Sequence, residues 1–354
     1  MSPPLVEGKS FPFPDQDITW AGECPWTGSL CFGTEDGELL LCRQVGNGVL
    51  LILPPIKVAN GAINDVAFWK EFVGISTPSE VVFARKSPSG DRIEPVIRTP
   101  DGAHGVLATP AGHFFAPMGT AGLLRVDANK IPVGGVTIDK PDQATPYFYR
   151  LIYLGKAADQ EILACAARTS GLLMIRSDSD HMDVVELASQ DVDFVDVCSM
   201  DSPEWPHAVV GLSWDGSLIF IRDLSQAQPQ ALRLEELHGS PYSILSTDGH
   251  LFVLTSKRIV ALPNLLTRYL QGDRLDHPVP CRCTPIQAVD AYVSYGKHLL
   301  IVMDKEVRSF EIARLVQPGV EPSIGNGPPD LRDWGESELK LSPVQPSWES
   351  VVLT

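Results

Sequence analysis

Residues 208–224 read AVVGLSWDGSLIFIRDL, two apolar runs separated by the turn-forming pair Asp215-Gly216. An Asp-Gly pair between apolar runs is a strong signal for a β-hairpin, because both residues tolerate the positive φ angles of a tight turn. Val and Ile recur in the two runs, and β-branched residues favour strands. This stretch therefore predicts a hairpin of two buried strands.

The same unit recurs along the chain at a regular interval. Other instances include SLCFGTEDGELLLCR from Ser29 and LFVLTSKRIVAL from Leu251. One early apolar residue from each unit gives seven positions that lie 41 to 49 residues apart: Leu30, Val73, Phe114, Leu163, Val209, Leu251 and Leu299. A period in the forties, repeated seven times, is typical of a β-propeller with four-stranded blades.

Further strand-like runs flank each hairpin. An apolar run precedes it, as in DFVDVCSM from Asp193, and a more polar run usually follows, as in IEPVIRTP from Ile93. A blade whose outer edge faces water has this pattern. The predicted fold class is all-β, a seven-bladed β-propeller of four-stranded antiparallel blades over residues 1–315. A large β-sandwich or two small β-domains is the alternative, although neither predicts the same module seven times.

Three segments lie outside the repeat. PNLLTRYLQG, at 263–272, has apolar residues at helical spacing, which predicts a short helix where the sixth blade should have its outer strand. Residues 316–354 form a tail rich in Pro and Gly, expected to run over the surface or to be mobile. Either the N-terminal run 5–11 or the C-terminal run 350–353 closes the ring, and the shorter connection favours the N-terminal run.

Composition narrows the classes of partner. The chain has 354 residues, with 28 Lys+Arg against 44 Asp+Glu, and a formal net charge of −16. Nucleic acids and anionic membranes need a positive surface, so we expect neither as a direct partner. The start of the chain shows no secretory signal pattern, and seven cysteines is an odd count, so we expect a cytoplasmic protein with reduced thiols. Most of these cysteines lie in apolar runs, where Cys behaves as a small hydrophobe.

The hairpin WDGSLIFIRDL at 214–224, the module length and the number of modules together resemble WD-repeat propellers, over roughly residues 5–315. The Gly-His pair that usually opens such repeats is missing, and IRDL at 221–224 is the nearest match to the Trp-Asp ending. The family's Asp-His-Ser/Thr-Trp network is therefore assigned to no residue here. The resemblance implies a degenerate, WD-like propeller.

Catalytic motifs are weak or missing. GLSWDG at 211–216 resembles a nucleophile elbow, but it lies in a hairpin with no following helix, and its second Gly comes one residue too late. The chain has no phosphate-binding loop and no His-Glu-x-x-His motif. His277, Cys281 and Cys283 are of zinc-ligating types, but no fourth ligand is near in sequence. We predict no catalytic residue, no metal site and no cofactor, and interpret the HPVPCRC stretch as a loop.

A non-catalytic scaffold for protein recognition is the function that we predict, because a rigid disc can display loops at little ordering cost. A partner with a basic patch would suit the acidic chain. Candidate anchors near strand ends are Trp20, Trp69, Tyr149, Arg168, Trp214 and Tyr242; on the helix, Leu266, Arg268 and Tyr269; and in the tail, Trp334 and Trp348. Each of these residues has core or turn packing as its alternative. Two other hypotheses remain open: an enzyme, hydrolase or lactonase-like, with a site in the central channel, and the tail as the recognition element.

Overall fold

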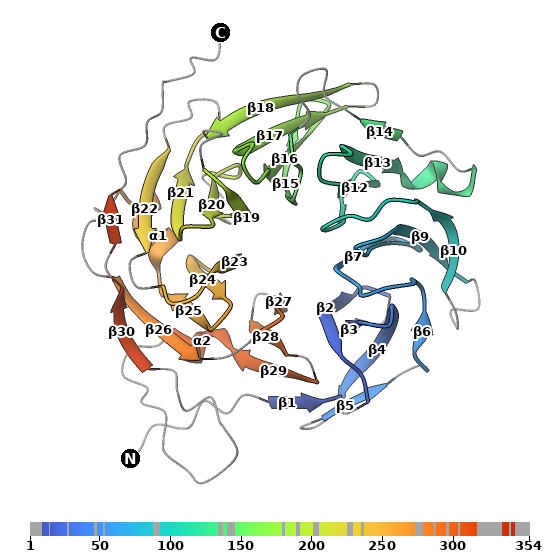
Figure 1. Ribbon diagram of the computed structural model, residues 1–354, viewed down its shortest axis with the longest axis horizontal. Helices are drawn as coiled ribbons and strands as arrows, with labels where there is room; N and C mark the ends of the chain where they lie inside the picture. Colours follow the sequence, from blue (N-terminus) through green and yellow to red (C-terminus); the bar gives the residue numbers. More distant parts are fainter. Residues whose placement is uncertain are drawn as a thin grey trace.

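The computed structural model describes residues 9–316, apart from stretches of one to six residues between strands, together with 335–339 and 341–343. Seven antiparallel sheets stand radially around a central channel, each sheet forming one blade (Figure 1). The predicted seven-bladed β-propeller is therefore confirmed, and the sandwich alternative is excluded.

The first four blades use consecutive strands, in order from the channel outward except where noted. Blade 1 contains β2 (Ile18–Cys24), β3 (Ser29–Thr34), β4 (Glu38–Val45) and β5 (Gly48–Leu51), with the short β6 (Ile56–Lys57) also paired to β4. Blade 2 contains β7 (Asp65–Trp69), β8 (Phe72–Ser76), β9 (Val81–Lys86) and β10 (Ile93–Arg98). Blade 3 contains β11 (Leu107–Ala108), β12 (His113–Pro117), β13 (Leu123–Asp127) and β14 (Thr137–Asp139), with the 3-10 helix η1 (Ala128–Val133) before β14. Blade 4 contains β15 (Arg150–Ala157), β16 (Gln160–Ala166), β17 (Leu172–Ser177) and β18 (Met182–Ala188).

The last three blades include strands from distant parts of the chain. Blade 5 contains β19 (Phe194–Ser199), β20 (Val209–Ser213), β21 (Ser217–Ile221), β22 (Gln230–Leu234) and, outermost, β31 (Leu341–Pro343). Blade 6 contains β23 (Pro241–Thr247), β24 (His250–Thr255), β25 (Arg258–Leu262), β26 (Val279–Pro285) and, outermost, β30 (Gly335–Leu339). Blade 7 contains β27 (Asp290–Ser294), β28 (His298–Met303), β29 (Glu306–Glu311) and, outermost, β1 (Lys9–Pro12).

The N-terminal segment closes the ring, as the shorter connection predicted. Strand β1 pairs antiparallel with β29 from Lys9 opposite Ser309 to Pro12 opposite Glu306. The first strand of the chain thereby completes the last blade, so the ring has no unpaired first or last sheet. The C-terminal run 350–353, the competing candidate, lies outside the described residues.

Two findings extend or correct the sequence-based picture of the C-terminal half. Residues 335–339 and 341–343 of the tail add fifth strands to blades 6 and 5 through antiparallel pairing. The stretch that we interpreted as a loop contains β26, the outer strand of blade 6. The predicted helix, α1 (Leu265–Leu270), precedes this strand instead of replacing it, because it takes up only one short part of the connection. A second short helix, α2 (Ile312–Leu315), follows β29.

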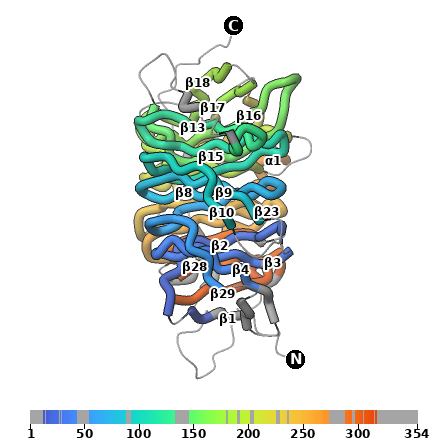
Figure 2. The backbone as a smooth tube through the Cα atoms, turned by 90° about the vertical axis from the view of Figure 1, so that its right-hand side faces the viewer, coloured from blue at the N-terminus to red at the C-terminus, as the bar shows by residue number. Residues whose placement is uncertain are grey.

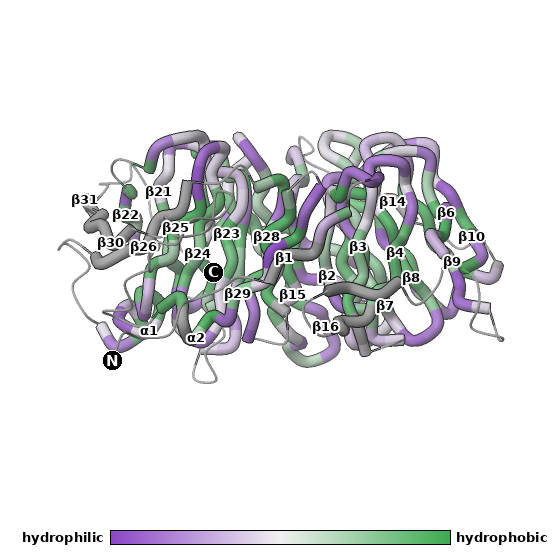
Figure 3. Tube along the Cα trace, turned by 90° about the horizontal axis from the view of Figure 1, so that it is seen from below, coloured by the Kyte–Doolittle hydropathy of each residue, from purple (hydrophilic) through white to green (hydrophobic). Residues whose placement is uncertain are grey.

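The core consists of seven apolar clusters, each lying between two neighbouring blades. Successive residues of a strand alternate between the two faces of its blade, so Leu163 packs toward blade 3 while Ala164 packs toward blade 5. Seen from the edge, neighbouring blades lie face to face (Figure 2). Apolar residues concentrate along the strands, and polar residues concentrate in the turns on the two faces of the ring (Figure 3). A sheet buried on both faces needs apolar residues at nearly every position, as the repeated runs indicated.

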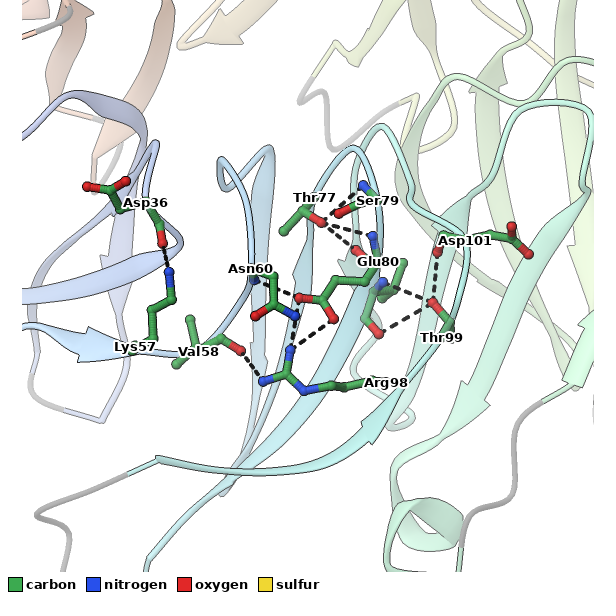
Figure 4. Close-up of polar contacts among 11 residues, drawn as sticks. Asp36, Lys57, Val58, Asn60, Thr77, Ser79, Glu80, Arg98, Thr99 and Asp101 are labelled. Carbon is green, nitrogen blue, oxygen red and sulfur yellow. Dashed lines mark hydrogen bonds and ion pairs between the residues drawn. The ribbon is translucent and has the colours of Figure 1, made fainter.

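An ion pair between the exposed Arg98 and the buried Glu80 joins the connection between blades 1 and 2 to blade 2 itself (Figure 4). Arg98, at the end of β10, donates from Nη1 to both Glu80 oxygens at 2.8 and 2.9 Å, and from Nη2 to the Val58 carbonyl at 3.0 Å. The Asn60 N–H donates to the same carboxylate at 2.7 Å. Because Glu80 is buried, these charge-assisted bonds fix the entry of the chain into blade 2.

The described cysteine side chains are free thiols. Cys24, Cys31, Cys42, Cys165 and Cys198 are all buried in the strands. Burial raises the pKa of Cys42 and of Cys165 to about 12, because it disfavours the thiolate. Buried in the strands, these thiols pack as small hydrophobic groups.

Candidate functional site

Three of the predicted anchors meet on one face of the ring. Tyr149 immediately precedes β15, Arg168 lies in the β16–β17 turn, and Trp214 lies in the β20–β21 turn. Because the strands of a blade are antiparallel, these turns and the connections that enter each blade share one face. The Arg168 Cζ lies 5.2 Å from the centre of the Tyr149 ring and 5.5 Å from that of Trp214. We call these three residues the rim cluster.

Local geometry holds the rim cluster in place. Arg168 has a φ of 50°, a turn conformation, and its Nε lies 3.1 Å from Oδ1 of Asp193. That oxygen accepts no aligned hydrogen bond in the described part of the chain, so the contact is an ion pair. The Trp214 N–H donates to the Asp193 carbonyl at 2.8 Å. Asp193, in the connection between blades 4 and 5, therefore joins both turns.

Trp214 is the exposed member of the cluster. Trp214 is 49% exposed, whereas most large apolar residues of the described chain are buried. The adjacent turn is well ordered by hydrogen bonds, because Asp215 accepts from the Ser217 N–H at 3.1 Å and from the Ser213 hydroxyl. An exposed indole on a fixed turn can contact a partner without first being ordered.

His104 extends the cluster toward blade 3. Its ring centre lies 4.6 Å from that of Tyr149, and its Nε2 is 2.9 Å from the Tyr147 hydroxyl. Burial lowers the pKa of His104, and the positive charges of Arg150 and Arg168 lower it further. The imidazole is therefore neutral at pH 7, so the cationic character of this rim comes from the two arginines.

Below the rim cluster, the central channel contains a cavity of about 380 Å³. Four charged residues line it, each from the inner strand of a different blade: Asp65, Arg150, Asp196 and Asp290. Arg150 also connects the two regions, because its Cζ lies 6.0 Å from the centre of the Tyr149 ring. Three carboxylates thus share the lumen with one guanidinium.

Two of these carboxylates accept hydrogen bonds from the neighbouring blade. Asp65 accepts from the Val66 N–H of its own strand at 2.8 Å and from the Val106 N–H of the next blade at 3.1 Å. Asp196 likewise accepts from the Ile244 N–H of the next blade at 2.9 Å. Backbone donors therefore engage both carboxylates, and these hydrogen bonds connect neighbouring blades.

The charged groups of the channel shift one another's pKa values. Burial raises the pKa of Asp290 to about 7; Arg150 lowers it, while Asp65 and Asp196 raise it further. Burial also raises the pKa of Asp65 and of Asp196. Burial opposes the charge of Arg150, but the three carboxylates outweigh this effect and raise its pKa.

The other predicted anchors near strand ends are engaged within the fold. Trp20 is buried between blades 1 and 2, the packing alternative that the sequence left open. The Trp69 indole N–H donates to the Pro110 carbonyl at 3.4 Å, and its ring lies under Lys70. The Tyr242 hydroxyl donates to the Ala288 carbonyl at 2.6 Å.

Helix α1 packs on its own part of the ring. Leu266 and Tyr269 are buried in the cluster between blades 5 and 6. Arg268 is half-buried and has an interaction within the fold. Trp334, Trp348 and His277 lie outside the described residues, and Cys281 and Cys283 lie on β26. Across the described side chains, no group of three or more His, Cys, Asp or Glu residues is arranged to hold a metal ion.

Sequence reasoning missed the charged residues of the channel. Asp65, Asp196 and Asp290 each precede an apolar residue in the first strand of a module, in NDVAF, VDVCS and VDAYV. This shared position in three modules was a usable signal. It indicates proximity only once the modules are known to form a ring.

Comparisons with known proteins support the fold. No family model and no curated protein matches the chain. Among solved structures, the WD40 β-propeller domain of Doa1 matches with a TM-score of 0.59 at 11% identity, covering 87% of this chain and 96% of that one. The β-propeller domain of Myceliophteria thermophila Cps50 (Swd1) matches with a TM-score of 0.62 at 11% identity, covering 85% and 98%.

The fold thus defines a class, the seven-bladed β-propellers, and its architecture is similar to that of WD40 propeller domains. At this level of identity the likeness concerns architecture, and the function has to be argued from the site. Among the helices that the structure describes, none is long and apolar enough to cross a bilayer.

Proposed function

We propose that this protein is a non-catalytic interaction scaffold that recruits a partner protein through the rim cluster. The observation that carries the proposal is the exposed Trp214 beside Arg168 and Tyr149, presented by turns of two neighbouring blades. Trp, Tyr and Arg are the residues that most often dominate binding energy at protein interfaces.

The architecture supports this role physically. The two turns extend from strands that are buried on both faces, so the anchors are held before any partner arrives. A preorganised surface loses little side-chain entropy on binding, and more of the contact energy appears as affinity. The net charge of −16 favours a partner with a basic surface through faster encounter. The similar WD40 propellers are compatible with a scaffold, but they identify no partner.

The test is quantitative affinity purification of the full chain from its own host, comparing wild type with Trp214→Ala. We expect one protein to co-elute stoichiometrically with wild type and to be reduced by about tenfold or more with the variant, since loss of an interface Trp commonly costs 2 kcal/mol or more. Because Trp214 is half exposed, the free energy of unfolding of the variant should lie within about 0.5 kcal/mol of the wild-type value.

Val96→Ala is the matched control, because Val96 is also an exposed large apolar residue, 42% exposed, but lies on the outer strand of blade 2. It should retain the partner at the wild-type level. If both variants retain the co-eluting protein equally, the rim cluster is not the interface. If no protein co-elutes and the chain turns over a small molecule, the scaffold proposal is wrong.

A further inference from the structure

Arg150 is a half-buried cation whose guanidinium has no hydrogen-bond or ion-pair partner among the described residues. It begins the inner strand of blade 4 and lines the channel cavity. It makes no hydrogen bond and no ion pair with any residue in the described part of the chain, although three carboxylates act on its charge. A charged donor that is partly removed from bulk water gains from an acceptor with a negative charge, so an anionic group in the lumen would be favoured beside it.

Asp290 is the corresponding group of opposite charge. Its Oδ1 accepts from the Ala291 N–H at 2.8 Å, but its second oxygen accepts nothing among the described residues. In this respect it differs from Asp65 and Asp196, whose carboxylates also reach a donor of the next blade. Among the described residues, the Arg150 guanidinium and the second oxygen of Asp290 therefore face this cavity without a hydrogen-bond partner.

Arg150 and Asp290 line the same cavity. Position 105, beside Arg150, is a glycine, and a Cβ there would lie 3.6 Å from Arg150 Nη1 and 3.2 Å from Asp65 Oδ2. The cavity of about 380 Å³ lies within the size range of small-molecule sites. Polar groups such as Ser246 and Tyr292 complete the wall near the charged residues.

We propose that the central channel binds a small zwitterion of the amino-acid class, with its carboxylate on Arg150 and an ammonium group on Asp290. The guanidinium fork matches a carboxylate, and the free oxygen of Asp290 accepts from an ammonium. Three aspartates face one arginine, so a basic amino acid, which carries one further positive charge, suits the site best. This site goes beyond the scaffold role and uses none of the three rim-cluster residues.

Isothermal titration calorimetry with L-lysine at pH 8, where Asp290 is ionised, tests the proposal. Cadaverine lacks the carboxylate of lysine, and hexanoate lacks its ammonium groups, so each probes one half of the site. We expect L-lysine to bind one-to-one, and both analogues to bind about tenfold more weakly or worse, because charge-assisted hydrogen bonds contribute 1.5 kcal/mol or more. Undetectable binding of L-lysine at millimolar concentration, or equal binding of cadaverine, would overturn the proposal.

Variants locate the binding within the molecule. Asp290→Asn keeps the acceptor for the Ala291 N–H and removes only the charge, so it should fold and bind L-lysine about tenfold more weakly or worse. Arg150→Gln should lose binding too, but the Asp290 variant decides the question if the Arg150 variant does not fold. Asp36→Asn, in an exposed turn, is the control that removes a charge elsewhere and should bind normally. Unchanged binding by Asp290→Asn would place the ligand outside the channel and overturn the assignment.

Discussion

Single residues of the channel make the stability of the ring depend on pH. Asp290 has a pKa of about 7 in the folded chain, because of burial and the nearby carboxylates of Asp65 and Asp196, partly offset by Arg150. Its pKa in the unfolded chain is about 4, so between these values the folded state holds more protons than the unfolded state. Stability from this group is therefore present below pH 4 and is lost as the pH rises to 7.

Asp290→Asn should remove this loss. We expect the free energy of unfolding of the variant, minus that of wild type, to rise by about 1–2 kcal/mol from pH 5 to pH 8. This is less than the full pKa shift of Asp290 would give, because water in the channel screens the charge. Urea unfolding at the two pH values measures it. An equal difference between variant and wild type at both pH values would contradict the account, because it would show that ionisation of Asp290 costs the fold nothing.

Hairpin turns are the elements on which the sequence prediction depended, and they differ in how tightly they are packed. Gly37, in the β3–β4 turn, has a φ of 77°, and a Cβ there would lie 2.4 Å from the Ala59 carbonyl oxygen. Its own carbonyl accepts from the Val58 and Ala59 N–H groups at 3.0 and 3.1 Å. We expect Gly37→Ala to lower the free energy of unfolding by about 2–4 kcal/mol, through left-handed strain and displacement of this connection.

Gly28 supplies the matched control for that prediction. It has a φ of 59° before β3, but a Cβ there would meet nothing within 4 Å. Gly28→Ala should therefore cost only the backbone strain, about 1–2 kcal/mol. Chemical denaturation of both variants separates strain from crowding. Equal losses in free energy of unfolding for the two variants would mean that the segment around Ala59 moves at no cost to make room for the added Cβ.

The elements also show how far local sequence carries a prediction. The inner three strands of each blade were predictable, because apolar runs with turn signals are local features. Strand β26 was not, since VPCRCTP contains two prolines and becomes a strand by pairing with β25 and β30. Strand β30, GESEL, is polar and pairs across a long sequence separation. The same limit applied to the site: Tyr149, Arg168 and Trp214 were predicted one by one, but their contact depends on neighbouring blades.

At the scale of the whole molecule, the two ends of the chain contribute differently to the ring. Strand β1 supplies the fourth strand of blade 7 and links the start of the chain to its last blade. Strands β30 and β31 add to sheets that already have four strands. Removal of β1 therefore opens the closure, whereas removal of the tail strands leaves every blade with the four strands of a complete sheet.

Deleting residues 1–12 should lower the free energy of unfolding by at least about 2 kcal/mol, since backbone hydrogen bonds contribute about 1 kcal/mol each and β29 becomes an unpaired edge. The deletion keeps Phe13, which packs in the cluster between blades 7 and 1, so it tests strand pairing rather than core loss. Deleting residues 335–354 should lower the free energy of unfolding by less, because it exposes the edges of β22 and β26 but leaves the ring of seven blades closed. Urea unfolding of the two truncated chains ranks these effects. A greater loss on deleting the tail would show that the C-terminal strands, and not β1, hold the ring together.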